Sequence, residues 1–217
     1  MIPHYFAMDE TAAREFAIKL AAGTLVSVDD DGQFHTSFLP ILWRGDEIIM
    51  HMGRANSHWR VIGQGRRSIM FFTGPNGYVS ALDYDLPEEM SSASTWDYTH
   101  VEVHGHAQVI PGQDFARQAA LDLSYHHEVA AAQQLTEDYL QRTSKAIVGL
   151  TFTVDTIRGA AKLSQNKLPH EREKIIARLR ASKTPRNTAL ADDIAAAPSK
   201  ARRVPYTGAL RSVKRGE

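Results

Sequence analysis

Hydrophobic and polar positions alternate along much of this chain, which is the pattern of strands with one buried face. In Glu47–Met52, the side chains of Ile48, Met50 and Met52 share one face, and the pattern stops at Gly53. Similar apolar stretches cover residues 24–28, 34–43, 68–73, 99–110 and 147–157. Helical spacing is found after Asp9, from about 115 to 123, from about 169 to 180 and from about 188 to 197.

Six or seven strands in hairpin-like succession, with helices between some of them, predict a mainly β, α+β fold. We expect an antiparallel barrel with helices packed around it. The aspartates at 29–31 with Gly32 predict a hairpin turn, and Pro40 is expected to interrupt the strand at 34–43. Gly23 is expected to end the first helix, residues 74–77 (G-P-N-G) predict a turn, and residues 82–97 predict a long loop.

The composition excludes several classes of protein. There is no cysteine among the 217 residues, which excludes disulfides, thiolate catalysis and a zinc site built on sulfur. No apolar run is long enough for a membrane helix, and the N-terminus lacks the basic start and apolar middle of a signal peptide. We therefore expect a cytoplasmic protein with no membrane association.

The net charge of zero conceals a basic C-terminal arm. Residues 198–217 contain one acidic residue, Glu217, against six basic ones: Lys200, Arg202, Arg203, Arg211, Lys214 and Arg215. We expect a barrel domain over residues 1–182, followed at 183–217 by a helix and a flexible basic tail. No helix-turn-helix signature is evident. Direct binding of nucleic acid would therefore use the tail or a dimer surface.

The segment from Glu47 to Trp59 is the candidate anion site. A strand ends at Gly53, and Arg54, Asn56 and Ser57 then precede a helix that is expected to begin near Asn56 or Ser57. Arginine offers a bidentate fork, and a helix N-terminus offers free backbone N–H groups. The alternative is an ordinary strand-turn-helix whose arginine is only solvated.

Residues 99–110 place several histidines on one face of a strand. His100, Glu102, His104 and His106 share that face at a period of two, opposite Val101 and its apolar neighbours. Such a row could bind a metal ion. A polar sheet face, or one covered by a subunit partner, explains the same pattern, and we expect no metal.

Five segments in a fixed order resemble the PaiB family of FMN-binding negative transcriptional regulators. They are H-M-G-R-A-N-S-H-W at 51–59, G-P-N-G-Y-V-S at 74–80, S-T-W-D-Y-T-H-V-E-V-H-G at 94–105, I-V-G-L at 147–150 and K-L-S-Q-N-K at 162–167. The resemblance covers about residues 1–180. It implies a split β-barrel of the flavin-binding type, assembled as a homodimer with its sites at the subunit interface.

The resemblance and the residues together give a candidate FMN site. Its phosphate end is expected at Arg54, Asn56 and the helix N-terminus, with Trp59 behind. Thr36 and Ser37 are expected on a strand that pairs with residues 47–52. The full set of cofactor-binding candidates is His51, Met52, Arg54, Asn56, Trp59, Thr36, Ser37, Lys162, Gln165 and Asn166.

Three functions stay open on the sequence. The first is a dimeric FMN-binding regulator, the second a flavin-dependent oxidoreductase on the same barrel, and the third a haem-handling protein, since the chain has ten histidines. The family pattern is altered at Ala81 and Ala160, which leaves open a barrel that has lost its cofactor. No catalytic residue is assigned.

Overall fold

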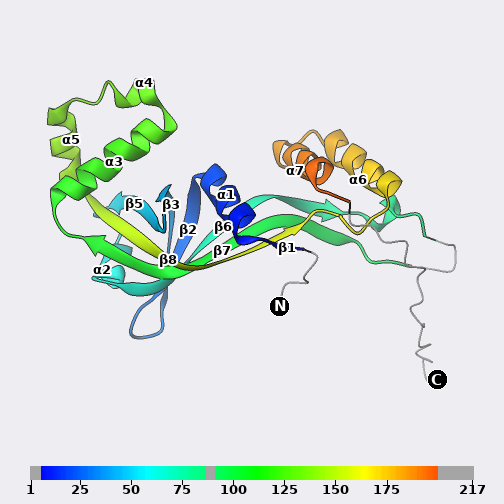
Figure 1. Ribbon diagram of the computed structural model, residues 1–217, viewed down its shortest axis with the longest axis horizontal. Helices are drawn as coiled ribbons and strands as arrows, with labels where there is room; N and C mark the ends of the chain where they lie inside the picture. Colours follow the sequence, from blue (N-terminus) through cyan, green and yellow to red (C-terminus); the bar gives the residue numbers. More distant parts are fainter. Residues whose placement is uncertain (1–5, 87–90, 200–217) are drawn as a thin grey trace. The chain divides into compact units, whose positions relative to one another are not determined.

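The computed structural model describes residues 6–86 and 91–199 of the chain (Figure 1). These residues form two compact units. One comprises the described residues up to Asn76 together with Asp97–Lys162, and the other comprises Gly77–Trp96 with the described residues from Leu163 onward. The predicted boundary between residues 182 and 183 falls between two helices that contact each other, and it stays a prediction.

The strands form one antiparallel sheet whose path is β3-β2-β6-β7-β8-β5-β4, with β1 added on β8. This confirms the predicted α+β fold with an antiparallel sheet. The strands are β1 (Ala7–Met8), β2 (Ala22–Val28), β3 (Phe34–Pro40), β4 (Leu42–Arg44), β5 (Glu47–Gly53), β6 (Arg66–Val79), β7 (Thr95–Ile110) and β8 (Ile147–Lys162).

The two ends of this path are joined by a single residue. β3 begins the path and β4 ends it, yet only Ile41 separates them in the chain, so the sheet must curl until its ends meet. β3 also contacts β5 without sharing a ladder with it. Pro40 cannot donate to a ladder, which accounts for the break between β3 and β4. The result is a barrel that is open between β3 and β5.

The barrel interior is filled by the inward faces of the strands. Met50, Met70, Phe72 and Phe152 are fully buried there. Helix α1 (Glu10–Leu20) adds Ala13 and Ala17 to the same core, and Asp9 caps it as predicted, because its carboxylate accepts from Ala12 N at 2.8 Å. The predicted stop at Gly23 is wrong. The helix ends at Ala21, which adopts φ 55°, and β2 begins at the next residue.

The predicted turn at residues 74–77 is also wrong. These residues lie inside the 14-residue strand β6. Gly74 is needed for packing rather than for turning, because a Cβ there would lie 2.7 Å from Phe16 Cζ. β7 and β8 are likewise longer than their predicted spans, with 16 residues each.

The remaining helices follow the apolar spacing of the sequence. In the barrel unit, the single turn α2 (His58–Ile62) follows β5. The helices α3 (Gln113–His127), α4 (Val129–Ala132) and α5 (Glu137–Thr143) come after β7 and before β8 in the chain, and α4 and α5 both contact α3 (Figure 1). In the second unit, α6 (Pro169–Ala181) packs on α7 (Pro185–Ala196). No helix in the described part of the chain is long and apolar enough to cross a membrane.

Candidate functional site

The turn after β5 holds Arg54 in one orientation. Its Nε donates to Lys145 O at 3.1 Å and its Nη2 donates to Ile147 O at 3.3 Å. These carbonyls belong to the segment that enters β8, so the side chain ties the turn to the neighbouring strand. The Arg54 guanidinium stays exposed, and none of the described carboxylates pairs with it.

Trp59 brings a second arginine to the same place. Its Nε1 donates to Arg54 O at 3.0 Å, which fixes the indole against the turn. The guanidinium carbon of Arg54 lies 5.8 Å from the centroid of the indole, and that of Arg60 lies 4.9 Å from it. Both cations therefore sit in the range of cation–π contact with one ring.

Asn56 is held from two sides by buried partners. Its Nδ2 donates to Ser37 Oγ at 2.8 Å, and its Oδ1 accepts from His58 N at 3.0 Å. Ser37 Oγ is also 2.9 Å from His58 Nδ1. Because the Ser37 hydroxyl accepts from Asn56, its proton is available to Nδ1, which places the His58 proton on Nε2.

His58 is the most deeply buried member of this network. Its side chain is 2% exposed, and Nε2 meets no hydrogen-bond partner among the described residues. Burial, and secondly the nearby His35, lowers the pKa of His58 to about 4. The His35 ring stacks on it with centroids 6.0 Å apart. At neutral pH, His58 is therefore an uncharged group that organises Asn56 and Ser37.

A carboxylate completes the chain of contacts on the far side of His35. Asp29 Oδ2 lies 2.8 Å from His35 Nε2, while Asp29 Oδ1 accepts from the N–H groups of Gln33 and Asp31. The bond to His35, with those backbone bonds, holds the pKa of Asp29 below its usual value. This ties the β2–β3 hairpin turn to the stacked pair of His35 and His58.

One local prediction about this region is wrong, and a second, the helix start near Asn56 or Ser57, is met within one residue but without the capping bond. β3 does not pair with residues 47–52, since it pairs with β2 at Thr36↔Val26 and Ser37↔Leu25. Ser37 reaches Asn56 through its side chain, whereas Thr36 is exposed on the opposite face of β3. The helix after the turn begins at His58 and spans five residues, and Ser57 makes no capping bond. A helix of one turn with its first N–H already bonded to Asn56 offers little to a phosphate.

The other predicted residues are scattered. Met52 is 3% exposed in the barrel core, and His51 is half-buried on the other face of β5, where burial lowers its pKa. Lys162 Nζ lies 3.3 Å from Asp97, which is itself buried. Gln165 and Asn166 belong to the second unit, where Gln165 Oε1 accepts from Leu163 N. The structure thus brings together Arg54, Asn56, Trp59 and Ser37.

Sequence reasoning missed three residues of this cluster. His58 and Arg60 lie within four residues of Asn56 but were not assigned a role, and His35 is one strand residue from Thr36. A signal was present for Arg60. Residues 48–82 contain four arginines and no aspartate or glutamate, so any cation there lacks a local counter-ion.

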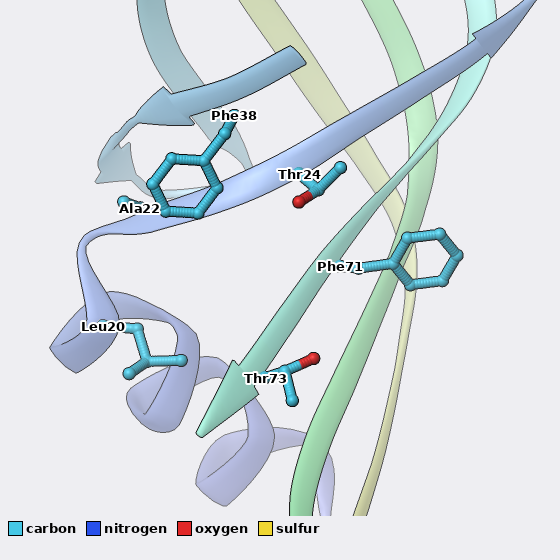
Figure 2. A pocket seen from close by; sticks show the side chains of 6 residues that line it. All are labelled: Leu20, Ala22, Thr24, Phe38, Phe71 and Thr73. Atoms are coloured by element: carbon cyan, nitrogen blue, oxygen red, sulfur yellow. The ribbon is translucent and has the colours of Figure 1, made fainter. Parts of the chain in front are cut away.

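The outer face of the sheet carries a shallow pocket. Leu20, Ala22, Thr24, Phe38, Phe71 and Thr73 line it, and Figure 2 shows the two phenyl rings on either side of Thr24. Its volume is about 210 Å³. Since Phe38 and Ser37 are neighbours on β3, the pocket and the Ser37 network lie on opposite faces of that strand.

The histidine row of β7 forms as predicted, with His100, Glu102 and His104 on the face opposite the core. Glu102 lies between the two histidines, with Oε2 at 3.3 Å from His104 Nε2 and Oε1 at 4.0 Å from His100 Nε2. Among residues 6–86 and 91–199, no group of three or more histidines and carboxylates is arranged to hold a metal ion. In this row, Glu102 contacts both His100 and His104, so it forms a polar sheet face whose members contact one another.

Comparison with known proteins agrees with this architecture. The protease synthase and sporulation protein PAI 2 of Bacillus subtilis (strain 168) is 25% identical over 202 residues, which cover 88% of this chain and 94% of that protein. The structure of the FAD and heme binding protein from Mycobacterium smegmatis matches with a TM-score of 0.56 and 18% identity, over 72% of this chain and 73% of that one.

The flavocytochrome Anf3 from Azotobacter vinelandii matches with a TM-score of 0.52 and 12% identity, over 73% of this chain and 70% of that one. These likenesses show that the chain shares the fold of those two proteins, a split barrel. Residues 1–156 match the family described as "Putative FMN-binding domain". The chain belongs to this FMN-binding domain family and is PaiB-like.

Proposed function

We propose that this protein binds FMN as a homodimer and acts as a negative transcriptional regulator of the PaiB kind. The observation that carries the FMN assignment is Arg54, an exposed guanidinium fixed by two backbone carbonyls and paired with none of the described carboxylates. A cation held in place by Lys145 O and Ile147 O loses little conformational entropy when it binds an anion.

The residues present fit the phosphate end of FMN. Nε and Nη2 of Arg54 are engaged, so Nη1 remains to donate to a phosphate oxygen. Asn56 uses both atoms of its amide on Ser37 and His58, so it positions the turn. FMN, when bound, supplies a redox-active ring. The residues named here bind and orient its phosphate.

The ring needs more surface than one chain offers. Ligand pockets usually have volumes of roughly 300–1,000 Å³. The outer-face pocket of about 210 Å³ falls below that range. This pocket lies on the face of β3 opposite the Ser37 network, so one chain does not bring it to Arg54, and the proposal requires a second copy of the chain to complete the site.

The outer face has the composition of an interface. Phe34 and Phe38 on β3 are 74% and 73% exposed, and the ladder sets Phe38, Thr24 and Phe71 in one row across three strands. His100 of β7 extends the row, since its ring stacks on Phe71 with centroids 5.5 Å apart. Aromatic side chains exposed together on a sheet are typical of subunit contacts.

Phe38→Glu is therefore expected to convert the dimer to a monomer, because a carboxylate would be buried without a partner. Light scattering at micromolar concentration measures the change. Tyr139→Glu is the matched control, since Tyr139 is exposed on α5 and away from β3. A wild type that is monomeric, or a Phe38→Glu variant that stays dimeric, would contradict this interface.

Absorbance and titration test the cofactor. Flavin bands in the purified protein, or quenching of FMN fluorescence on addition of the ligand-free protein, are the expected results. A strong Soret band would favour a haem-handling protein instead. Oxidation of reduced nicotinamide with bound flavin would favour an oxidoreductase. Failure of the wild type to bind FMN would contradict the proposal.

Contact with nucleic acid is proposed through the dimer surface or the basic tail. The tail was predicted for residues 198–217, of which 200–217 lie outside the described residues. Six positive charges on such an arm would attract phosphates in a salt-dependent way. A chain ending at Ala197 is expected to keep its melting temperature and to lose retention on DNA at low salt. Unchanged retention would remove the tail from the mechanism.

A further inference from the structure

The segment between Ile48 and Leu82 is unusually one-sided in charge. It contains Arg54, Arg60, Arg66 and Arg67 and no acidic residue. Arg66 obtains a counter-ion from a distant hairpin, because its Nη1 lies 2.9 Å from Asp30 Oδ1. Within the described ranges, no carboxylate pairs with the other three arginines. Two of those three meet at Trp59.

The indole fixes an upper limit on the separation of the two cations. Because the guanidinium carbons of Arg54 and Arg60 lie 5.8 and 4.9 Å from one ring centroid, they can be no more than about 11 Å apart. An anion that contacts both cations has to bridge no more than this separation. Both side chains are exposed, so the anion can enter from solvent.

The Arg54–Arg60 pair consists of two like charges. They repel each other, and salt screens much of this repulsion because both side chains are exposed. Three other arginines of the barrel unit pair with acids: Arg14 with Asp46, Arg44 with Asp122 and Arg117 with Glu137. The Arg54–Arg60 pair departs from this arrangement.

The two arginines are also held differently. The Arg54 side chain donates to two carbonyls and offers a fixed donor, whereas the Arg60 guanidinium lies over the indole and makes no side-chain hydrogen bond with the described residues. A fixed donor can set the position of a ligand. A cation held only by stacking can turn toward a second charge on the same ligand.

We propose that Arg54 and Arg60 together bind a phosphate ligand that carries two negative charges, with Arg60 setting the preference for a phosphorylated ligand over its unphosphorylated form. The identification of that ligand as FMN rests on the proposed function. The phosphomonoester of FMN is doubly charged above its second ionisation, near pH 6. Riboflavin has the same ring and ribityl chain without that charge.

The experiment compares Arg60→Ala with Arg67→Ala on the full chain. Each substitution removes one exposed arginine that no described carboxylate pairs with, but only Arg60 contacts Trp59. Binding of FMN, riboflavin and inorganic pyrophosphate is measured by calorimetry at about pH 8. Arg60→Ala is expected to weaken the binding of FMN and of pyrophosphate roughly tenfold, as for loss of one charge-assisted contact. The affinity for riboflavin is expected to stay unchanged. Arg67→Ala is expected to change FMN binding less than about twofold.

The outcomes separate the two proposals. If FMN binds and Arg60→Ala behaves like Arg67→Ala, the role of Arg60 is refuted while FMN binding stands. If Arg60→Ala weakens the binding of FMN and of riboflavin equally, Arg60 contacts the ring or supports the folded structure, and its role in the preference for phosphate is refuted. If pyrophosphate binds and depends on Arg60 but FMN does not bind, the anion site stands and the FMN assignment fails. Binding of neither ligand refutes both.

Discussion

Acidification from about pH 7.5 to about pH 4.5 is expected to lower the free energy of unfolding by about 2.5 kcal/mol through His58 alone. The cause is its burial beside Ser37 and His35. A protonated imidazole at 2% exposure would lose its hydration, and it would stand against the stacked ring of a second histidine.

The sign follows from proton binding in the two states. The folded-state pKa of His58 is lowered to about 4, whereas in an unfolded chain the pKa of His58 would have its ordinary value of 6.5. Between these two values the unfolded chain binds more protons than the folded chain. Stability is therefore fully present above the unfolded pKa and is lost as the pH falls toward the folded pKa.

Urea denaturation of wild type and His58→Asn at both pH values measures this effect. The asparagine amide can still accept from Ser37, but it carries no proton in this range. The wild type is expected to lose about 2.5 kcal/mol more than the variant on acidification. His127→Asn, at an exposed site at the end of α3, is the matched control. Equal losses in wild type and His58→Asn would mean that His58 charges freely in the folded state.

The strands were predictable because apolar residues alternate with polar ones along them, and the apolar positions form the buried face. The alternation of Ile48, Met50 and Met52 placed β5 correctly, and the same period placed the core face of β7. A buried face requires an apolar residue at every second position, so local sequence is sufficient. The split-barrel assignment came from the motifs, since alternation alone does not specify which strands are neighbours.

The errors arose where a distant part of the chain decides the local structure. Gly74 and Pro75 predict a turn on their own, but the Phe16 ring from α1 occupies the space above Gly74 and the strand continues. The expected pairing of β3 with β5 failed for a similar reason. β3 follows β2 through a tight hairpin and pairs with it, and it meets β5 only where the barrel is open.

The candidate site was predictable in part. Arg54, Asn56 and Trp59 lie within six residues, so their proximity is local. His35 and His58 are 23 positions apart in sequence, and nothing local shows that they stack. The network of Ser37, Asn56 and His58 likewise depends on β3 passing beside the turn, which only the three-dimensional fold reveals.

The second large effect is expected from Arg54→Ala, which should weaken FMN binding between about tenfold and a hundredfold. The reason is the loss of a charge-assisted contact worth roughly 1.5–3 kcal/mol. The same substitution removes two hydrogen bonds to Lys145 O and Ile147 O. We therefore also expect a loss of about 1–2 kcal/mol in the free energy of unfolding, although the side chain is exposed.

The loss of the phosphate contact and the loss of stability have to be separated, because a less stable turn would weaken the binding of any ligand at this site. Arg54→Lys keeps the positive charge, but its three donors are on a single nitrogen and cannot reproduce the separate Nε and Nη2 bonds to Lys145 O and Ile147 O. It should lose as much stability as Arg54→Ala while retaining more of the FMN affinity. Titration of ligand-free protein with FMN and with riboflavin, followed by flavin fluorescence, supplies the comparison. If Arg54→Ala binds FMN as well as the wild type does, Arg54 holds the turn and the phosphate lies elsewhere. If FMN and riboflavin weaken together, the turn shapes the site and Arg54 does not select the phosphate.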